Sequence, residues 1–253
     1  MIAKPLRTVL YADDDPDIRE IVRISLGLAQ DLEVHTAPSG ERALALAREL
    51  QPDLVMLDVM MPGLDGPGTF RRMRKDPGVA RIPVIFMTAK AMPNEVAVLM
   101  EMGALGVIGK PFDPMLLVAQ VTALWQGRPA EPPSVAKVAD DSGLHQEVRK
   151  LGDRFLQRTR EEAVRLRNLI ELVHQGDMVQ IEELKSLAHR IRGSGSTFGF
   201  VAVSECARDI ERAVDGFRDP DAKSGSALES EIRRRLSEHA LLLIREVEAA
   251  VVR

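Results

Sequence analysis

Residues 53–66 read DLVMLDVMMPGLDG, an apolar run that meets an aspartate and then a turn rich in proline and glycine. Short apolar runs bounded by turn residues are typical of strands in a parallel sheet, which are buried on both faces. The stretch therefore predicts a buried strand that ends at Asp58.

Similar runs alternate with helical patterns over residues 1–126. The other strand-like runs are TVLYA, LEVHTA, PVIFMT and GVIG, and amphipathic patterns such as SGERALALARELQ lie between them. Five strands that alternate with five helices are the signature of a doubly wound parallel sheet. We therefore expect an α/β domain with a five-stranded parallel sheet over residues 1–126.

The rest of the chain has a different organisation. Residues 127–143, GRPAEPPSVAKVADDSG, contain three prolines and interrupt all periodicity, which predicts a linker. Residues 144–253 keep helical spacing, with breaks near HQGDMV, GSGSTFGF and FRDPDAKSGSA. This pattern predicts an all-α four-helix bundle.

Composition excludes several classes of protein. A formal net charge of -4 gives no general electrostatic reason to bind nucleic acid, and the basic cluster EIRRRLSEH is interpreted as a solvated helix face. No apolar run approaches the roughly 18 residues of a membrane span, and no signal peptide is visible at the start. The single cysteine, Cys206, fits a reducing compartment. We expect a cytoplasmic protein.

Charged and hydroxyl side chains follow the expected strands. The first strand is expected to end in Asp13, Asp14 and Asp15, the third in Asp58, the fourth in Thr88, and the fifth in Gly109, Lys110 and Pro111. Ligands of open parallel sheets bind beyond the carboxyl ends of the strands. Three neighbouring carboxylates repel one another unless a cation joins them, and a divalent ion with oxygen ligands such as Mg²⁺ fits. A lysine and a threonine can hold a phosphoryl group, so the site predicts phosphoryl transfer to a carboxylate.

Four segments, LYADDDPDIR, DLVMLDVMMPGLDG, IPVIFMTAKA and GALGVIGKPFD, resemble in order and spacing the receiver domain of two-component response regulators. The resemblance covers residues 1–126 and implies a flavodoxin-like fold. It implies that Asp58 is the phosphoacceptor, and that Asp13 and Asp14 hold Mg²⁺ with help from the backbone carbonyl of Met60.

The same resemblance assigns roles on the phosphate side of the site. Thr88 would contact the phosphoryl oxygens, and Lys110 would pair with the phosphate through a cis bond to Pro111. Many receivers carry an aromatic residue three positions before this lysine as a conformational switch. Here that position is Val107, so a switch relayed by an aromatic side chain is not expected.

Residues 186–200, SLAHRIRGSGSTFGF, place a histidine before two glycines in a helical pattern. On a helical wheel, one narrow stripe faces the core. It comprises Leu184, Leu187, Ala188, Ile191, Gly195 and Phe198. His189 lies roughly 140° from the centre of this stripe and is expected to point outward. Gly193 and Ser196 share its face, Arg192 lies beside it, and Gly195 would let a neighbouring helix approach closely.

The segment AHRIRGSGSTFGF, followed by VSECARDIERAV, resembles the phosphoacceptor region of histidine-containing phosphotransfer (HPt) domains. The resemblance covers residues 144–253. It implies that His189 is a phosphoacceptor, that Arg192 replaces a more usual lysine, and that Gly193 leaves room for a receiver. The other histidines, His35, His145, His174 and His239, are interpreted as structural.

Together these resemblances imply a phosphorelay protein. Asp58 would accept a phosphoryl group from a phosphohistidine of a sensor histidine kinase or another donor, and His189 would exchange phosphoryl groups with a receiver aspartate. No Gly-rich nucleotide loop is visible, so the protein would catalyse its own phosphorylation without being an ATP-dependent kinase. Two alternatives stay open: a module whose receiver exposes or hides the bundle, and an adaptor whose histidine does not react.

Overall fold

The computed structural model describes residues 5–89, 92–128, 142–175, 178–217 and 226–251. The chain divides into two compact units, Met1–Val148 and Arg149–Arg253, and each is described by itself. Most of the expected linker, 127–143, lies outside the described residues.

The first unit contains a five-stranded parallel sheet with the strand order β2-β1-β3-β4-β5. This order is that of flavodoxin-like doubly wound sheets, and the predicted α/β fold is confirmed. The strands are β1 (Thr8–Ala12), β2 (Glu33–Ala37), β3 (Leu54–Asp58), β4 (Val84–Thr88) and β5 (Gly106–Gly109).

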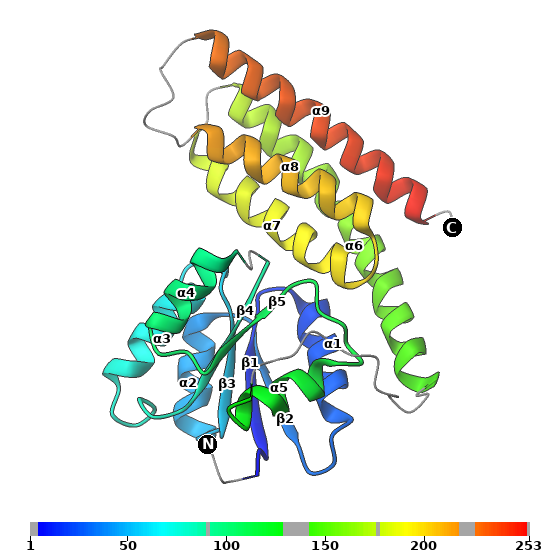
Figure 1. Cartoon of the computed structure of the whole chain (residues 1–253). Helices are drawn as coiled ribbons and strands as arrows, with labels where there is room; N and C mark the ends of the chain where they lie inside the picture. The colour runs from blue at the N-terminus through cyan, green and yellow to red at the C-terminus, as the bar shows by residue number, and fades with distance from the viewer. Residues whose placement is uncertain (1–4, 90–91, 129–141, 176–177, 218–225, 252–253) are drawn as a thin grey trace. The chain divides into compact units, whose positions relative to one another are not determined.

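Five helices cover the two faces of this sheet. In Figure 1, α1 and α5 lie on one face, and α2, α3 and α4 lie on the other. The helices are α1 (Pro16–Gly27), α2 (Gly40–Leu50), α3 (Gly66–Lys75), α4 (Pro93–Glu101) and α5 (Leu117–Trp125). Since both faces are covered, β3 and β4 are buried along their whole length.

Local sequence fixes where the helices begin. Asp15 caps α1 by accepting hydrogen bonds from the backbone N–H groups of Asp17 and Ile18, and Pro16 occupies the first turn. Asp65 caps α3 by accepting from the backbone N–H of Gly68. These caps start α1 and α3 just after β1 and β3, which leaves the residues between strand and helix at the sheet edge.

The second unit is helical, as predicted. Its long helices are α6 (Ser142–His174), α7 (Ile181–Thr197), α8 (Val201–Phe217) and α9 (Ser226–Val251), with a short 3₁₀ helix at Met178–Gln180. Each helix contributes to a common apolar core, for example through Phe155, Leu187, Ile210 and Leu243. The four long helices confirm the predicted bundle (Figure 1).

Helix α7 continues through both glycines of the GSGST segment and ends at Thr197. The expected break at GSGSTFGF is therefore confined to its last residues. Gly199 has φ 84°, and Phe200 donates a backbone hydrogen bond to the carbonyl of Gly195 at 2.7 Å. This left-handed glycine with its backward hydrogen bond is a Schellman ending, which satisfies carbonyls that the helix leaves free.

Gly195 lies in the core stripe, as predicted, and a neighbouring helix approaches it closely. A Cβ atom on Gly195 would lie 2.6 Å from Oγ of Ser204 and 3.4 Å from the carbonyl oxygen of Phe200. Alanine would fit here only if the Ser204 side chain rotated or α8 shifted. Among the described helices of the chain, none is long and apolar enough to cross a membrane.

Candidate functional site

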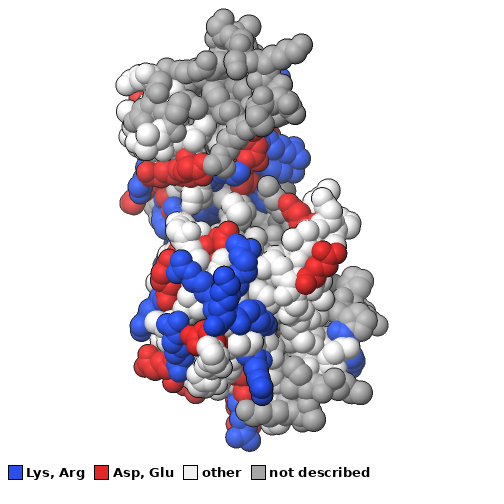
Figure 2. Space-filling view, turned by 90° about the vertical axis from the view of Figure 1, so that its left-hand side faces the viewer, with Lys and Arg blue, Asp and Glu red and all other residues white. Residues whose placement is uncertain are grey.

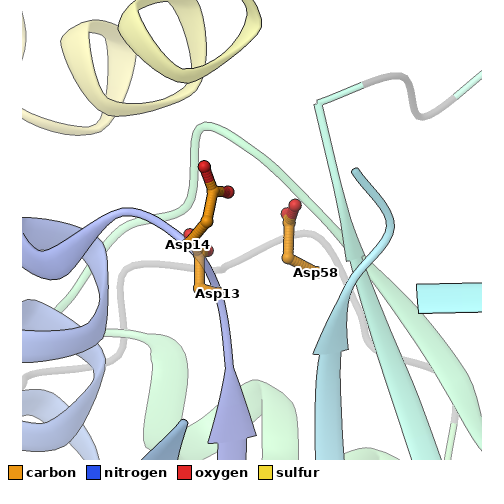
Figure 3. A group of neighbouring side chains, drawn as sticks. All are labelled: Asp13, Asp14 and Asp58. Atoms are coloured by element: carbon orange, nitrogen blue, oxygen red, sulfur yellow. The ribbon is translucent and has the colours of Figure 1, made fainter. Parts of the chain in front are cut away.

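Three carboxylates meet at the carboxyl edge of the sheet (Figure 3). Asp13 and Asp14 follow β1, and Asp58 ends β3, which pairs with β1 in parallel register. One oxygen atom from each of the three side chains lies within 4.8 Å of the others. Asp13 and Asp58 are buried and Asp14 is half-buried, so this edge brings together the acids that the sequence predicted.

Lys110 bridges two of these acids. Its Nζ donates to Oδ2 of Asp13 at 2.6 Å and to Oδ1 of Asp58 at 2.5 Å. The backbone N–H of Lys110 donates to the carbonyl of Thr88, which ties β5 to the end of β4, and the predicted cis bond to Pro111 is present. Burial lowers the pKa of Lys110, but the charges of Asp13 and Asp58 outweigh burial and leave the pKa above its ordinary value. The lysine is therefore a fixed cation.

Backbone donors orient the two buried carboxylates. Asp58 accepts from the backbone N–H of Met60 through Oδ2 at 3.0 Å, and Asp13 accepts from the backbone N–H of Asp15 through Oδ1 at 2.8 Å. Thr88, at the end of β4, is buried beside the same edge. Thus Asp58 and Asp13 each accept from Lys110 and from one backbone N–H, and both are held in place before any ligand arrives.

Tyr11 is a contributor that the sequence argument missed. It is 0% exposed on β1, and its hydroxyl donates to Oδ2 of Asp13. Burial, followed by the negative charges of Asp13 and Asp58, raises the pKa of Tyr11 well above its ordinary value. The available signal was its place two residues before Asp13, because alternate residues of a strand point to the same face.

The donor set fits a hard divalent cation. Carboxylate oxygens are preferred ligands of Mg²⁺, with metal–oxygen distances of about 2.0–2.1 Å. Two oxygens on one such ion lie up to about 4.2 Å apart, and the three carboxylate oxygens lie within 4.8 Å of one another. The half-buried side chain of Asp14 gives the group an accessible edge.

A second polar cluster lies between α7 and α8. Nδ1 of His189 lies 2.6 Å from Oε1 of Glu211, and Arg192 donates to Oε2 of the same carboxylate. Glu211 is 2% exposed. One buried carboxylate therefore engages both the histidine and the arginine that the sequence singled out.

The sequence placed His189 on the outward face of α7, and the structure adds a contact that the helical wheel did not include. Helix α8 packs against α7 and brings Oε1 of Glu211 to Nδ1 of the His189 ring. The helical wheel identifies the apolar stripe of α7. It cannot predict a polar contact with another helix, such as that of His189 with Glu211. The predicted core residues of α7 lie inside the bundle, with Phe198 packed at its margin.

Glu211 was also missed. It lies four residues after Ala207 and three before Val214, both of which are buried in the bundle core. A charged residue on the apolar stripe of a helix is the signal that could have identified it.

The remaining histidines are less informative. His35 lies in β2 with Nε2 3.1 Å from Glu33, and His239 is half-buried in α9. The side chains of His145 and His174 lie outside the described residues. Their structural interpretation stays a prediction.

Comparison with protein families identifies both units. The model of the response regulator receiver domain matches residues 9–122, and the model of the Hpt domain matches residues 150–249. The RpaA regulator of Synechocystis sp., described as a DNA-binding dual master transcriptional regulator, is 37% identical over 213 residues, which cover 84% of this chain and 79% of RpaA. The chain belongs to the response regulator family. Its receiver domain is followed by an Hpt domain, and both are domains of phosphorelay signalling.

Other relatives cover a smaller share of the chain. The DNA-binding response regulator MtrA of Mycolicibacterium smegmatis is 37% identical over 145 residues, which cover 56% of this chain and 62% of MtrA. The chain thus spans less than two thirds of the length of MtrA. Among solved structures, the chemotaxis protein CheY4 of Vibrio cholerae is 30% identical with a TM-score of 0.44, covering 47% of this chain and 99% of CheY4.

A basic surface lies on one side of the receiver domain (Figure 2). Its exposed cations are Arg42 and Arg48 of α2 and Arg71, Arg72 and Lys75 of α3. Acidic residues interrupt this surface. Asp76 pairs with Arg48 at 2.6 Å, and Glu41 lines a surface pocket together with Arg48 and Asp76. The last turns of α2 and α3 lie toward the amino ends of the strands, opposite the edge that carries Asp58.

Proposed function

We propose that this protein relays phosphoryl groups through Asp58 of its receiver domain and His189 of its Hpt domain. The observation that carries the proposal is the ammonium of Lys110, fixed between Asp13 and Asp58 with a third carboxylate beside them. The proposed domain limits are 1–126 for the receiver, 127–143 for the linker and 144–253 for the Hpt domain.

At the first site, a carboxylate oxygen of Asp58 attacks the phosphorus of a partner's phosphohistidine. The new P–O bond forms as the P–N bond breaks, and the imidazole of the partner leaves with the bonding electron pair. Lys110 already contacts Asp58 and balances negative charge on the transferred group, while the hydroxyl of Thr88 donates to a phosphoryl oxygen.

Four groups of the receiver would hold Mg²⁺: the carboxylates of Asp13, Asp14 and Asp58 and the backbone carbonyl of Met60. A bound Mg²⁺ supplies further neutralisation of charge on the phosphoryl oxygens. The proximity of the three carboxylate oxygens supports this assignment.

At the second site, the contact with Glu211 selects one ring nitrogen. A proton on Nδ1 of His189 is donated to Glu211, which leaves the lone pair of Nε2 for attack on phosphorus. When Nε2 attacks a phosphoaspartate, the P–N bond forms and the P–O bond to the aspartate breaks. The ring gains positive character, and the carboxylate of Glu211 stabilises it.

The adaptor function is a second candidate, because Nδ1 of His189 is engaged by Glu211, a contact that a histidine with a purely structural role would also make. In this alternative the bundle binds partners without histidine phosphorylation. A His189→Gln variant that keeps full signalling output in cells would favour the adaptor, whereas loss of output downstream of the Hpt domain would favour transfer.

The proposed partners are a sensor histidine kinase or another phosphohistidine donor, and the receiver domain of another response regulator. We propose a cytoplasmic location and no role for nucleic acid, since acidic residues interrupt the basic surface of α2 and α3. A DNA mobility-shift assay at physiological salt concentration tests the last point: a salt-sensitive complex would contradict it.

The decisive experiment follows phosphoryl incorporation from a small phosphodonor with Mg²⁺ into the wild type, Asp58→Asn and His189→Gln. Phosphoaspartate is lost in alkali and phosphohistidine survives it. We expect alkali-labile label that requires Asp58, and alkali-stable label on His189 when a phosphorylated receiver is supplied. Unchanged labelling of Asp58→Asn would refute the proposed acceptor. Absence of label on His189 with every receiver tested would leave the adaptor.

A further inference from the structure

Tyr11 occupies an unusual position below the acidic edge of the receiver domain. Its side chain is fully buried in β1, and its hydroxyl donates to Oδ2 of Asp13. The same oxygen accepts from Nζ of Lys110 at 2.6 Å. A continuous chain of hydrogen bonds therefore runs from the Tyr11 hydroxyl through Asp13 and Lys110 to Asp58.

This chain constrains Asp13 on both of its oxygens. Oδ1 accepts from the backbone N–H of Asp15, and Oδ2 accepts from Tyr11 and Lys110. Lys110 is shared with Asp58, so it is the donor that must adjust when the charge at Asp58 changes. Tyr11 and Asp15 are then the two donors that keep the carboxylate of Asp13 in one orientation. Of these two, only Tyr11 is a side chain that can be replaced without altering the backbone.

We infer that Tyr11 is a positioning residue, which fixes the carboxylate of Asp13 for Mg²⁺ binding by donating its hydroxyl proton to Oδ2. The inference rests on the proposed function for the role of Asp13. Hydrogen-bond partners of ligating carboxylates set ligand orientation, and their loss typically costs about 10–100-fold in metal affinity. Phenylalanine fills the same volume, so Tyr11→Phe removes the donor and little else.

The composition of the chain allows a direct readout. Tyr11 is the single tyrosine among the 253 residues. Protein labelled with ¹³C at the tyrosine Cζ gives one resonance, whose shift reports the hydrogen bond of the phenol. We expect this resonance to move when Mg²⁺ is added to the full-length wild type and to differ in Asp13→Asn.

The quantitative test is calorimetric titration of Mg²⁺ into the full chain without phosphodonor. We expect Tyr11→Phe to bind Mg²⁺ about tenfold more weakly than the wild type. In the Asp13→Asn background the same substitution should have little further effect, because the oxygen that it positions no longer carries the ligand charge. Ser25→Ala is the matched control, since it removes a buried hydroxyl that has no hydrogen-bond partner in the described structure.

The outcomes test the role of Tyr11 and the proposed function separately. Unchanged Mg²⁺ affinity in Tyr11→Phe, or equal losses with and without the Asp13 carboxylate, overturns the role of Tyr11. A tyrosine resonance that does not shift when Mg²⁺ binds also overturns this role. That measurement uses only the wild-type protein, so it does not depend on the folding of a variant. Failure of Asp58 to become labelled in the wild type, with these Mg²⁺ results intact, would instead refute the proposed function alone.

Discussion

The carboxylate of Glu211 lies 2.6 Å from Nδ1 of His189, so one ring nitrogen of the candidate acceptor is engaged inside the bundle. Replacement of Glu211 by alanine removes the acceptor that orients the ring. We expect phosphoryl transfer to His189 to slow by about 100-fold, at the lower end of the range for positioned acid–base groups. Single-turnover transfer from a phosphorylated receiver measures this rate.

Two further variants define the cause. Glu211→Gln keeps an oxygen acceptor for Nδ1 and should retain more activity than Glu211→Ala. Glu205→Gln alters an exposed carboxylate of the same helix and should transfer at the wild-type rate. Equal activity of Glu211→Ala and Glu205→Gln would show that the contact with His189 has no role in transfer.

Lys110 separates two buried carboxylates, and its removal leaves them facing each other. We expect Lys110→Met to lower the free energy of unfolding by about 3–5 kcal/mol in the presence of a chelator. Saturating Mg²⁺ should restore part of this loss, because the cation binds only the folded state. Urea unfolding with and without Mg²⁺ gives both values.

Lys75→Met, on the exposed surface of α3, is the control and should change stability by less than about 0.5 kcal/mol. A loss that Mg²⁺ leaves untouched would argue against a shared acidic site.

Tyr11 predicts a specific alkaline behaviour. Its pKa is raised in the folded protein from an ordinary value of 10.0, so the native state keeps the phenol proton where the unfolded chain loses it. Stability from Tyr11 is therefore complete below about pH 10 and declines above it, by about 1.4 kcal/mol per pH unit. Urea unfolding between about pH 9 and 11 should show this decline in the wild type beyond that of Tyr11→Phe. Substantial tyrosinate absorbance at about pH 10 in the native protein would contradict the raised pKa of this phenol.

The close approach at Gly195 predicts unequal effects of two glycine substitutions. Gly195→Ala places a Cβ atom 2.6 Å from Oγ of Ser204 and should destabilise the Hpt domain by about 1–3 kcal/mol. At Gly152 in α6, the nearest atom to an added Cβ lies at 3.6 Å, an ordinary contact. Gly152→Ala should be neutral or stabilise by up to about 1 kcal/mol through helix propensity. Thermal unfolding of the two variants compares them, and similar melting temperatures would show that the structure adjusts around the added methyl group at no cost.

The sequence was most informative where the backbone alone determines position. Asp13 and Asp58 could be placed at one edge because parallel strands align their carboxyl ends, and the structure confirms that these acids are neighbours. The core stripe of α7 followed in the same way from helical periodicity.

Sequence reasoning failed where side chains from different helices meet. His189 contacts Glu211, which lies in another helix 22 residues further along the chain. Periodicity gives the face of one helix but not the partner that covers its edge, so a polar pair at a helix interface is lost. Tyr11 was overlooked for a related reason. Its aromatic ring fits a buried strand, and the sequence does not show which group its hydroxyl contacts.

The link from Lys110 to Asp13 joins residues 97 positions apart, and the link to Asp58 joins residues 52 positions apart. A partly assembled sheet that lacked β5 would hold the two carboxylates together without their cation. Repulsion between the two carboxylates would then destabilise such an intermediate. In the complete sheet Lys110 lies between them and removes this repulsion. The acidic edge thereby favours all-or-none folding of the receiver domain, so the residues assigned to signalling also discourage its partly folded forms.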